Sequence, residues 1–142
     1  MEAFVGKYQR HYEEHFEDIL VALEVPVILR LVAMQGPHVT GIWEEEEEEG
    51  LWTISSETPF LVMESKFTLG QEFKQTTPDG REVRATVTFE DGVLVMWERA
   101  KKKTQKSTKS TWKMNGPNEL IYTITIEGND DLVCLQLMKR LE

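Results

Sequence analysis

The chain has 142 residues, which is enough for one domain with a sizeable core. Its composition, 40% hydrophobic and 29% charged residues, is typical of a globular protein and excludes a disordered chain. The net charge of −9 disfavours nucleic acid as a partner, because an acidic surface repels phosphates. The longest apolar run, residues 19–23, is far too short to cross a bilayer, so we expect no stable membrane insertion.

The first ten residues do not place a basic segment before an apolar one, so we expect no secretory signal. Cys134 is the single cysteine, so an internal disulfide cannot form. A chain without disulfides fits a reducing compartment.

In chain order, residues 4–12 are short and mixed, and we interpret them as a strand. Two short helices are then predicted, near residues 14–23 and 26–34. The first carries apolar side chains at helical spacing, namely Phe16, Ile19, Leu20 and Leu23. Pro26 interrupts this pattern and suits the first turn of the second helix.

Everything after Pro37 is predicted to be β-structure. Segments of about six to nine residues are separated by turn signals, such as Pro78–Asp79–Gly80 and Asp91–Gly92. Such regular spacing indicates consecutive antiparallel strands, about ten with residues 4–12 included. A sheet of this length curls or closes, which removes its exposed edges. We therefore expect one all-β domain over residues 1–142.

The predicted strand 81–90 has an apolar face and a polar face. The apolar face holds Val83, Ala85, Val87 and Phe89, and by parity Arg81 belongs to it as well. Arg81 is therefore either exposed at the rim or paired inside, and the rim is the simpler interpretation.

Ten strands enclose more volume than their own side chains fill. Two short helices inserted after the first strand cannot cross such a barrel, but they can cover one mouth. The strand count and the position of the helices together predict a cavity under a lid.

Four segments resemble the intracellular lipid-binding proteins, the fatty-acid-binding and cellular retinoid-binding family. They are FVGKY (4–8), HFEDILVALEV (15–25), SKFTLGQEFKQTTPDGREV (65–83) and DLVCLQLMKR (131–140). The third is the most specific, and the four span the chain in the family's order. The resemblance implies a ten-stranded antiparallel β-clam, a lipocalin-like barrel, with a helix-turn-helix lid. It also implies a monomeric carrier without a cofactor, cytoplasmic and in some members nuclear, that binds one fatty acid or retinoid.

The sequence departs from the family where fatty-acid binders hold the ligand carboxylate. Their Arg-x-Tyr pair on the last strand corresponds here to Gln136 and Met138. A further family arginine corresponds to Thr111, although Lys109 or Lys113 shares its parity. The usual clamp is therefore absent. Glutamine offers only neutral hydrogen-bonding groups, and charge-assisted bonds are roughly twice as strong. Gln136, which also resembles the retinol-binding branch, favours a neutral or weakly polar headgroup, while Arg81 remains available to a carboxylate.

The full set of expected ligand-binding residues combines the lid, the portal and the interior: Phe16, Leu20, Ser56, Thr58, Phe60, Arg81, Thr111, Tyr122, Gln136 and Met138. No metal site is expected, because His11 and His15 lack a clear third ligand. Cys134 has no catalytic partner nearby in sequence and is expected to be buried and inert. An enzyme has no support in the sequence. The alternative to a carrier is a structural or partner-binding barrel whose interior is filled, for example by methionine side chains.

Overall fold

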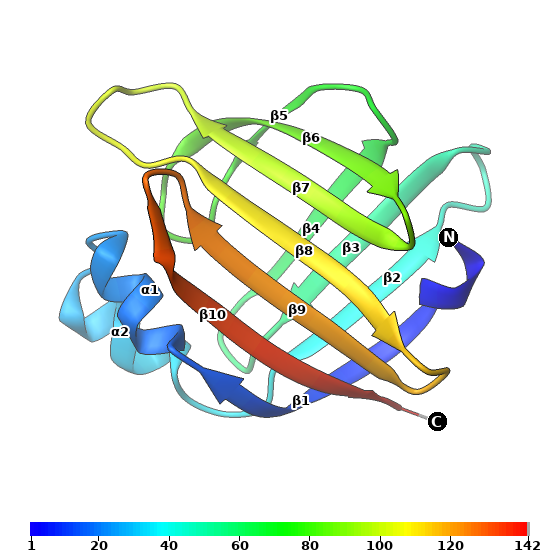
Figure 1. Ribbon diagram of the computed structural model, residues 1–142, viewed down its shortest axis with the longest axis horizontal. Helices are drawn as coiled ribbons and strands as arrows, with labels where there is room; N and C mark the ends of the chain where they lie inside the picture. Colours follow the sequence, from blue (N-terminus) through cyan, green and yellow to red (C-terminus); the bar gives the residue numbers. More distant parts are fainter. Residues whose placement is uncertain (142) are drawn as a thin grey trace.

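The computed structural model describes residues 1–141 and shows ten antiparallel strands in one sheet. The strands are β1 (Gly6–Glu14), β2 (Val39–Glu44), β3 (Leu51–Glu57), β4 (Val62–Thr68), β5 (Phe73–Thr76), β6 (Glu82–Glu90), β7 (Val93–Ala100), β8 (Thr108–Asn115), β9 (Glu119–Ile126) and β10 (Asn129–Arg140). The sheet order is β4-β3-β2-β1-β10-β9-β8-β7-β6-β5, and the sheet curls into a nearly closed barrel (Figure 1). The predicted fold class is confirmed.

The two edge strands, β4 and β5, meet across a seam without a strand ladder between them. Ser65 on β4 donates a side-chain hydrogen bond of 2.8 Å to Gln75 on β5. The backbone N–H of Gly70, in the turn after β4, bonds to the carbonyl of Val87 at 2.8 Å. These contacts cover edges that would otherwise be open to pairing with another chain.

Strand alternation sets the interior of the barrel, as the sequence predicts for β6. Val83, Ala85 and Val87 are fully buried, while Arg84 between them is exposed. Phe89, at the end of the same face, is 37% exposed and packs edge-to-face on Phe4 with ring centroids 5.9 Å apart.

Two helices, α1 (Phe16–Ala22) and α2 (Val27–Ala33), follow β1 and are slightly shorter than predicted. They lie beside the end of the barrel opposite to the two chain termini (Figure 1). Glu24 takes a left-handed conformation with φ 61°, which turns the chain between them. Helix α1 packs on β10, and its Ile19 is 2% exposed. Among residues 1–141, no helix is long and apolar enough to span a membrane.

The first strand begins later than predicted. Phe4 belongs to a short 3-10 turn over Glu2–Phe4, and β1 runs from Gly6 to Glu14. Its pairing with β10 shifts register between Arg10 and Tyr12. This irregularity matters for the interior, because it changes which side chains of β1 point inward after Arg10.

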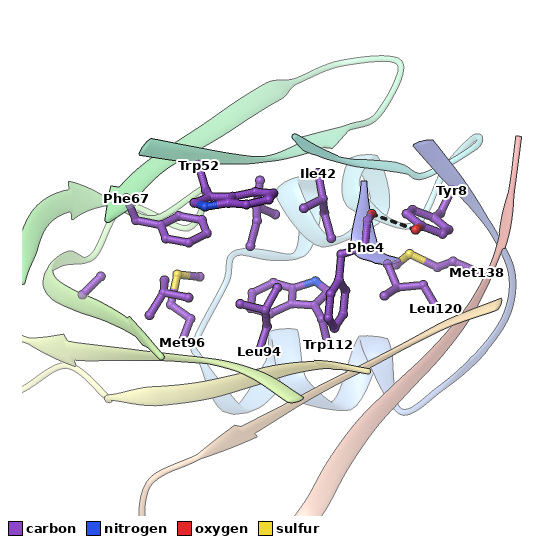
Figure 2. Close-up of a cluster of buried hydrophobic side chains, with 13 residues drawn as sticks. Phe4, Tyr8, Ile42, Trp52, Phe67, Leu94, Met96, Trp112, Leu120 and Met138 are labelled. Atoms are coloured by element: carbon purple, nitrogen blue, oxygen red, sulfur yellow. Dashed lines mark hydrogen bonds between the residues drawn. The ribbon is translucent and has the colours of Figure 1, made fainter. Parts of the chain in front are cut away.

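A cluster of thirteen buried side chains fills the barrel on the side away from the lid (Figure 2). Ile42, Trp52 and Phe67 from β2, β3 and β4 face Leu94 and Trp112 from β7 and β8. The Tyr8 hydroxyl donates to the carbonyl of Phe4 at 2.7 Å, which joins the start of the chain to this cluster.

Candidate functional site

The last strand presents a mixed polar and apolar face to the interior. Cys134, Gln136 and Met138 are 0%, 5% and 3% exposed, whereas Val133 on the other face is 38% exposed. Parity and hydrophobicity alone favour the more apolar face as the buried one. The structure buries the face that the resemblance indicates.

Gln136 is the first member of a line of polar side chains across the interior. Tyr122 on β9 lies directly opposite Gln136 in the strand register. The Tyr122 hydroxyl shares a hydrogen bond of 3.2 Å with Ser110 Oγ on β8. Burial raises the pKa of Tyr122, so its hydroxyl stays neutral and keeps both donor and acceptor capacity.

The line continues to the seam between β4 and β5. Thr108 Oγ1 donates to Glu98 Oε1 at 3.3 Å, and Gln75 Nε2 donates to Glu98 Oε2 at 2.8 Å. Gln75 in turn accepts from Ser65. We call this set the polar belt: Gln136, Tyr122, Ser110, Thr108, Glu98, Gln75 and Ser65.

Glu98 is the one carboxyl of the polar belt, and it is 7% exposed. Burial raises the pKa of Glu98, against the lowering effects of the Gln75 hydrogen bond and the Arg81 charge. A carboxyl that keeps its proton donates a hydrogen bond instead of repelling an anion. The direction of this shift favours the neutral form of Glu98, which repels an anion less than the ionised form does.

The expectation for Thr111 is wrong. Thr111 lies on the outer face of β8, where its hydroxyl bonds to that of Thr123. The inward positions of the strand are Ser110 and Trp112, which are 2% and 4% exposed. The inward face of β8 is therefore shifted by one residue from the face that we predicted. Lys109 shares the outer face and lies over the Trp97 ring.

The interpretation of Arg81 as a rim residue is also wrong. Arg81 is 5% exposed, and each of its three guanidinium nitrogens donates a hydrogen bond. Its Nε donates to Asp79 Oδ2 at 2.8 Å, and its Nη1 donates to the carbonyl of Lys106 at 2.6 Å. Asp79, two residues earlier in the turn, neutralises the guanidinium. Arg81 is thus already bound within the protein.

The lid contributes Phe16 and Leu20, both half-buried. The Phe16 ring packs edge-to-face on His38, with ring centroids 5.5 Å apart. The Arg10 guanidinium lies 5.3 Å from the centroid of the Phe16 ring. Arg10 comes from the inward face of β1, two residues after the fully buried Tyr8.

Ser56, Thr58 and Phe60 lie around the turn from β3 to β4, outside the interior. Ser56 is exposed, Phe60 is 60% exposed, and Thr58 accepts the backbone N–H of Leu61 at 3.2 Å. A Cβ added to Gly36, which follows α2, would lie 2.4 Å from Pro59, so this turn touches the end of the lid. Helix α2 exposes four apolar side chains beside it: Val27, Ile28, Leu29 and Leu31.

Sequence reasoning missed Arg10 and Glu98. The spacing of Tyr8 and Arg10 indicates that Arg10 points inward, because residues two apart share one face of a strand. The spacing of Leu94, Met96 and Glu98 indicates in the same way that Glu98 points inward. Neither residue lies in a motif of the resemblance that we used to select candidates.

The two histidines flanking the entry to α1 have separate partners. His11 Nε2 lies 3.6 Å from Glu119, and His15 Nδ1 lies 2.8 Å from Asp18. Within residues 1–141, no three His, Cys, Asp or Glu side chains group as metal ligands would. Cys134 is a buried free thiol, and burial raises its pKa to about 11.

Comparison with known proteins gives relatives along nearly the whole chain. Fatty acid-binding protein homolog 2 of Echinococcus granulosus is 33% identical over 141 residues, which cover 99% of this chain and 98% of the relative. Cellular retinoic acid-binding protein 2 of Bos taurus is 31% identical, with 99% of each chain covered. No family model matches the sequence.

A solved structure agrees with these relatives. The crystal structure of Echinococcus granulosus fatty-acid-binding protein 1 superposes with a TM-score of 0.88 at 29% identity, and the match covers 100% of both chains. The identity to curated relatives, the full coverage and the shared barrel lead to one conclusion. The chain belongs to the family of fatty acid-binding and cellular retinoic acid-binding proteins, which are lipid carriers and not enzymes.

Proposed function

We propose that the chain is a monomeric cytoplasmic carrier that binds one fatty acid, retinoid or related lipid inside the barrel. The observation that carries the proposal is the inward face of β10, where Gln136 and Met138 are buried. We take these two residues as the counterparts of the family's Arg-x-Tyr pair. The names of the relatives support the class of ligand, since they include fatty acid-binding and retinoic acid-binding proteins.

Gln136 and Met138 replace a charged clamp with a neutral one in this proposal. Gln136 offers an amide to the headgroup, and Tyr122 opposite it offers a neutral hydroxyl. Met138 provides a flexible apolar surface for the adjoining part of the ligand. The rest of the polar belt gives hydrogen-bonding positions for ligands with more than one polar group.

The portal in this proposal lies between α2 and the β3–β4 turn. Phe60 is 60% exposed there, and Ile28 on α2 is 71% exposed. Single apolar side chains at a surface are ordinary, but a group of them beside a barrel mouth suits the passage of an apolar chain. Ser56 and Thr58 then belong to the portal, and Phe16 and Leu20 contact the ligand from the lid.

A second candidate function is a structural or partner-binding barrel with a filled interior. The observation that favours it is the cluster of thirteen buried side chains, in which Trp52, Phe67 and Trp112 supply large rings (Figure 2). In this alternative the cluster occupies the space that a lipid tail needs. The side chains of the polar belt then form hydrogen bonds only with one another.

Native mass spectrometry of the purified protein distinguishes the two functions. The carrier is expected to bind one fluorescent fatty acid per chain, and solvent extraction is expected to release a lipid acquired in the host. Unlabelled oleate is expected to displace the probe. Ala85→Trp provides an internal block, because Ala85 is fully buried within the cluster of side chains inside the barrel. If solvent extraction releases no lipid and the fluorescent fatty acid does not bind, the result supports the barrel with a filled interior.

A further inference from the structure

Arg10 is a half-buried cation that the resemblance does not explain. It lies on the inward face of β1 and is paired in register with Met138 on β10. Its guanidinium lies over Phe16 of the lid, while Gln136 is two residues from Met138 on the same inward face. Arg10 therefore sits on the strand next to the missing clamp, under the lid.

The bonding of Arg10 is incomplete. Its Nη1 is buried and has no hydrogen-bond partner. The ion pairs found among residues 1–141 do not include Arg10. The nearby carboxylate of Glu13 accepts the backbone N–H of Phe16 at 3.1 Å. A buried charged donor without a partner is costly. Native proteins therefore retain such a donor where a ligand, an ion or a water molecule accepts its hydrogen bond.

Arg81, in the same barrel, is an arginine whose guanidinium group is hydrogen-bonded within the protein. Its Nε, Nη1 and Nη2 all donate, to Asp79 and to the carbonyl of Lys106. The two interior arginines thus differ in one respect that matters for a ligand. Every guanidinium nitrogen of Arg81 makes a hydrogen bond, whereas the buried Nη1 of Arg10 makes none.

We propose that Arg10 anchors an anionic headgroup, a carboxylate, of the lipid carried in the barrel. The positive charge that fatty-acid binders of this family place on the last strand is supplied here from β1, opposite Met138. The inference rests on the proposed carrier function and narrows its ligand class. Gln136 alone offers neutral bonds, and Arg10 beside it adds the charge that selects an acid over the corresponding alcohol.

The stacking on Phe16 links this anchor to the lid. A guanidinium over an aromatic face stays planar and keeps its edge free for bidentate bonding to a carboxylate. Because Phe16 belongs to α1, a headgroup bound at Arg10 lies beneath the first turn of the lid. The lid then covers the polar end of the ligand.

The test compares two ligands that differ only in the headgroup, oleate and oleyl alcohol. Calorimetric titration is made with the unmodified protein, Arg10→Met, Arg10→Lys and the control Arg84→Met, whose guanidinium is exposed on the outer face of β6. Arg10→Met is expected to weaken oleate binding about 10- to 100-fold, the value of a hydrogen bond to a charged group. Oleyl alcohol binding is expected to change less than about twofold on the same scale. Arg10→Lys is expected to be intermediate, and Arg84→Met unchanged.

The outcomes separate the two proposals. If the unmodified protein binds neither ligand, the carrier function itself fails. If it binds both, and Arg10→Met changes them equally or not at all, the anchor is not Arg10.

A second measurement uses the unmodified protein, in case Arg10→Met does not fold. Oleate labelled with ¹³C at the carboxyl is bound and titrated by NMR. An arginine partner is expected to hold the pKa of the bound carboxyl below its ordinary value, because the ionised form is stabilised. A bound carboxyl whose pKa is raised lies in an apolar or acidic site, which contradicts the proposal.

Discussion

Arg10 on β1 lies directly opposite Met138 on β10, so a cation from one strand is paired with an apolar side chain of the other. This pairing connects the fold to the proposed chemistry. The strand register places the charge, the lid packs on it through Phe16, and the polar belt extends from the neighbouring Gln136 across the barrel.

Gln136→Leu is expected to weaken lipid binding by about 1–2 kcal/mol, the net value of one or two neutral hydrogen bonds. The double change Gln136→Arg and Met138→Tyr is expected to raise oleate affinity, because it restores a charge-assisted clamp. Titration with oleate and retinol measures both effects. Lys139→Met, on the exposed face of the same strand, is the control. Unchanged affinities for both ligands in Gln136→Leu would show that this residue is not an anchor.

Glu98→Gln is expected to stabilise the protein, and more so at higher pH. Burial raises the folded-state pKa of Glu98, so the native state holds this proton more tightly than the unfolded chain does. Stability contributed by the protonated carboxyl is therefore lost as pH rises from the unfolded-state value through the folded-state pKa. Thermal unfolding between pH 4 and pH 8, roughly the range where buried carboxyls titrate, is expected to show a Tm advantage of the variant that grows with pH. The exposed Glu72→Gln is the control, and an advantage that shrinks with pH contradicts the prediction.

Cys134 is expected to resist thiol reagents in the native protein. Its side chain is fully buried, and burial raises its pKa to about 11, so the thiolate is scarce at neutral pH. Reaction with a chromogenic disulfide reagent is expected only after denaturant is added. Glu127→Cys, at an exposed position, provides a thiol that reacts at once in the folded state. Fast modification of the unmodified native protein would mean that the lid end opens readily.

Ligand transfer to membranes is expected to be insensitive to anionic lipid. The first turn of α1 carries Glu17 and Asp18, both exposed, and like charge discourages docking on phosphatidylserine. Transfer of a fluorescent fatty acid to acceptor vesicles with and without phosphatidylserine measures this directly. Glu17→Lys with Asp18→Lys is expected to make the rate rise with phosphatidylserine. A steep rise in the unmodified protein would point to another contact surface, such as the exposed lysines 101–103 of the β7–β8 loop.

The sequence predicts the fold well because turn signals and strand alternation are local. The ten strands and both helices follow from the positions of residues such as Gly80 and Pro26. The inward face of β10 could be predicted only from the family resemblance, because the opposite face of the strand is more apolar. Burial there is decided by the neighbouring strands and the lid, not by the strand itself.

The candidate site was less predictable, for two physical reasons. The face on which Thr111 lies depends on the register of β8, and a shift of one residue reverses the face of every side chain on a strand. The burial of Arg81 depends on Asp79 and on the Lys106 carbonyl, 25 residues away in sequence. Such partners come together only when β6 and the β7–β8 loop are placed in space.

A crystal structure of the protein grown with oleate tests the central claim most directly. One fatty acid is expected inside the barrel, with its tail among the side chains of the buried cluster and its headgroup between Arg10 and Gln136 under the lid. Trp52, Trp112 and Met96 are expected to shift to admit the tail. An interior with the thirteen side chains packed as before, and oleate absent or bound on the outer surface, would contradict it.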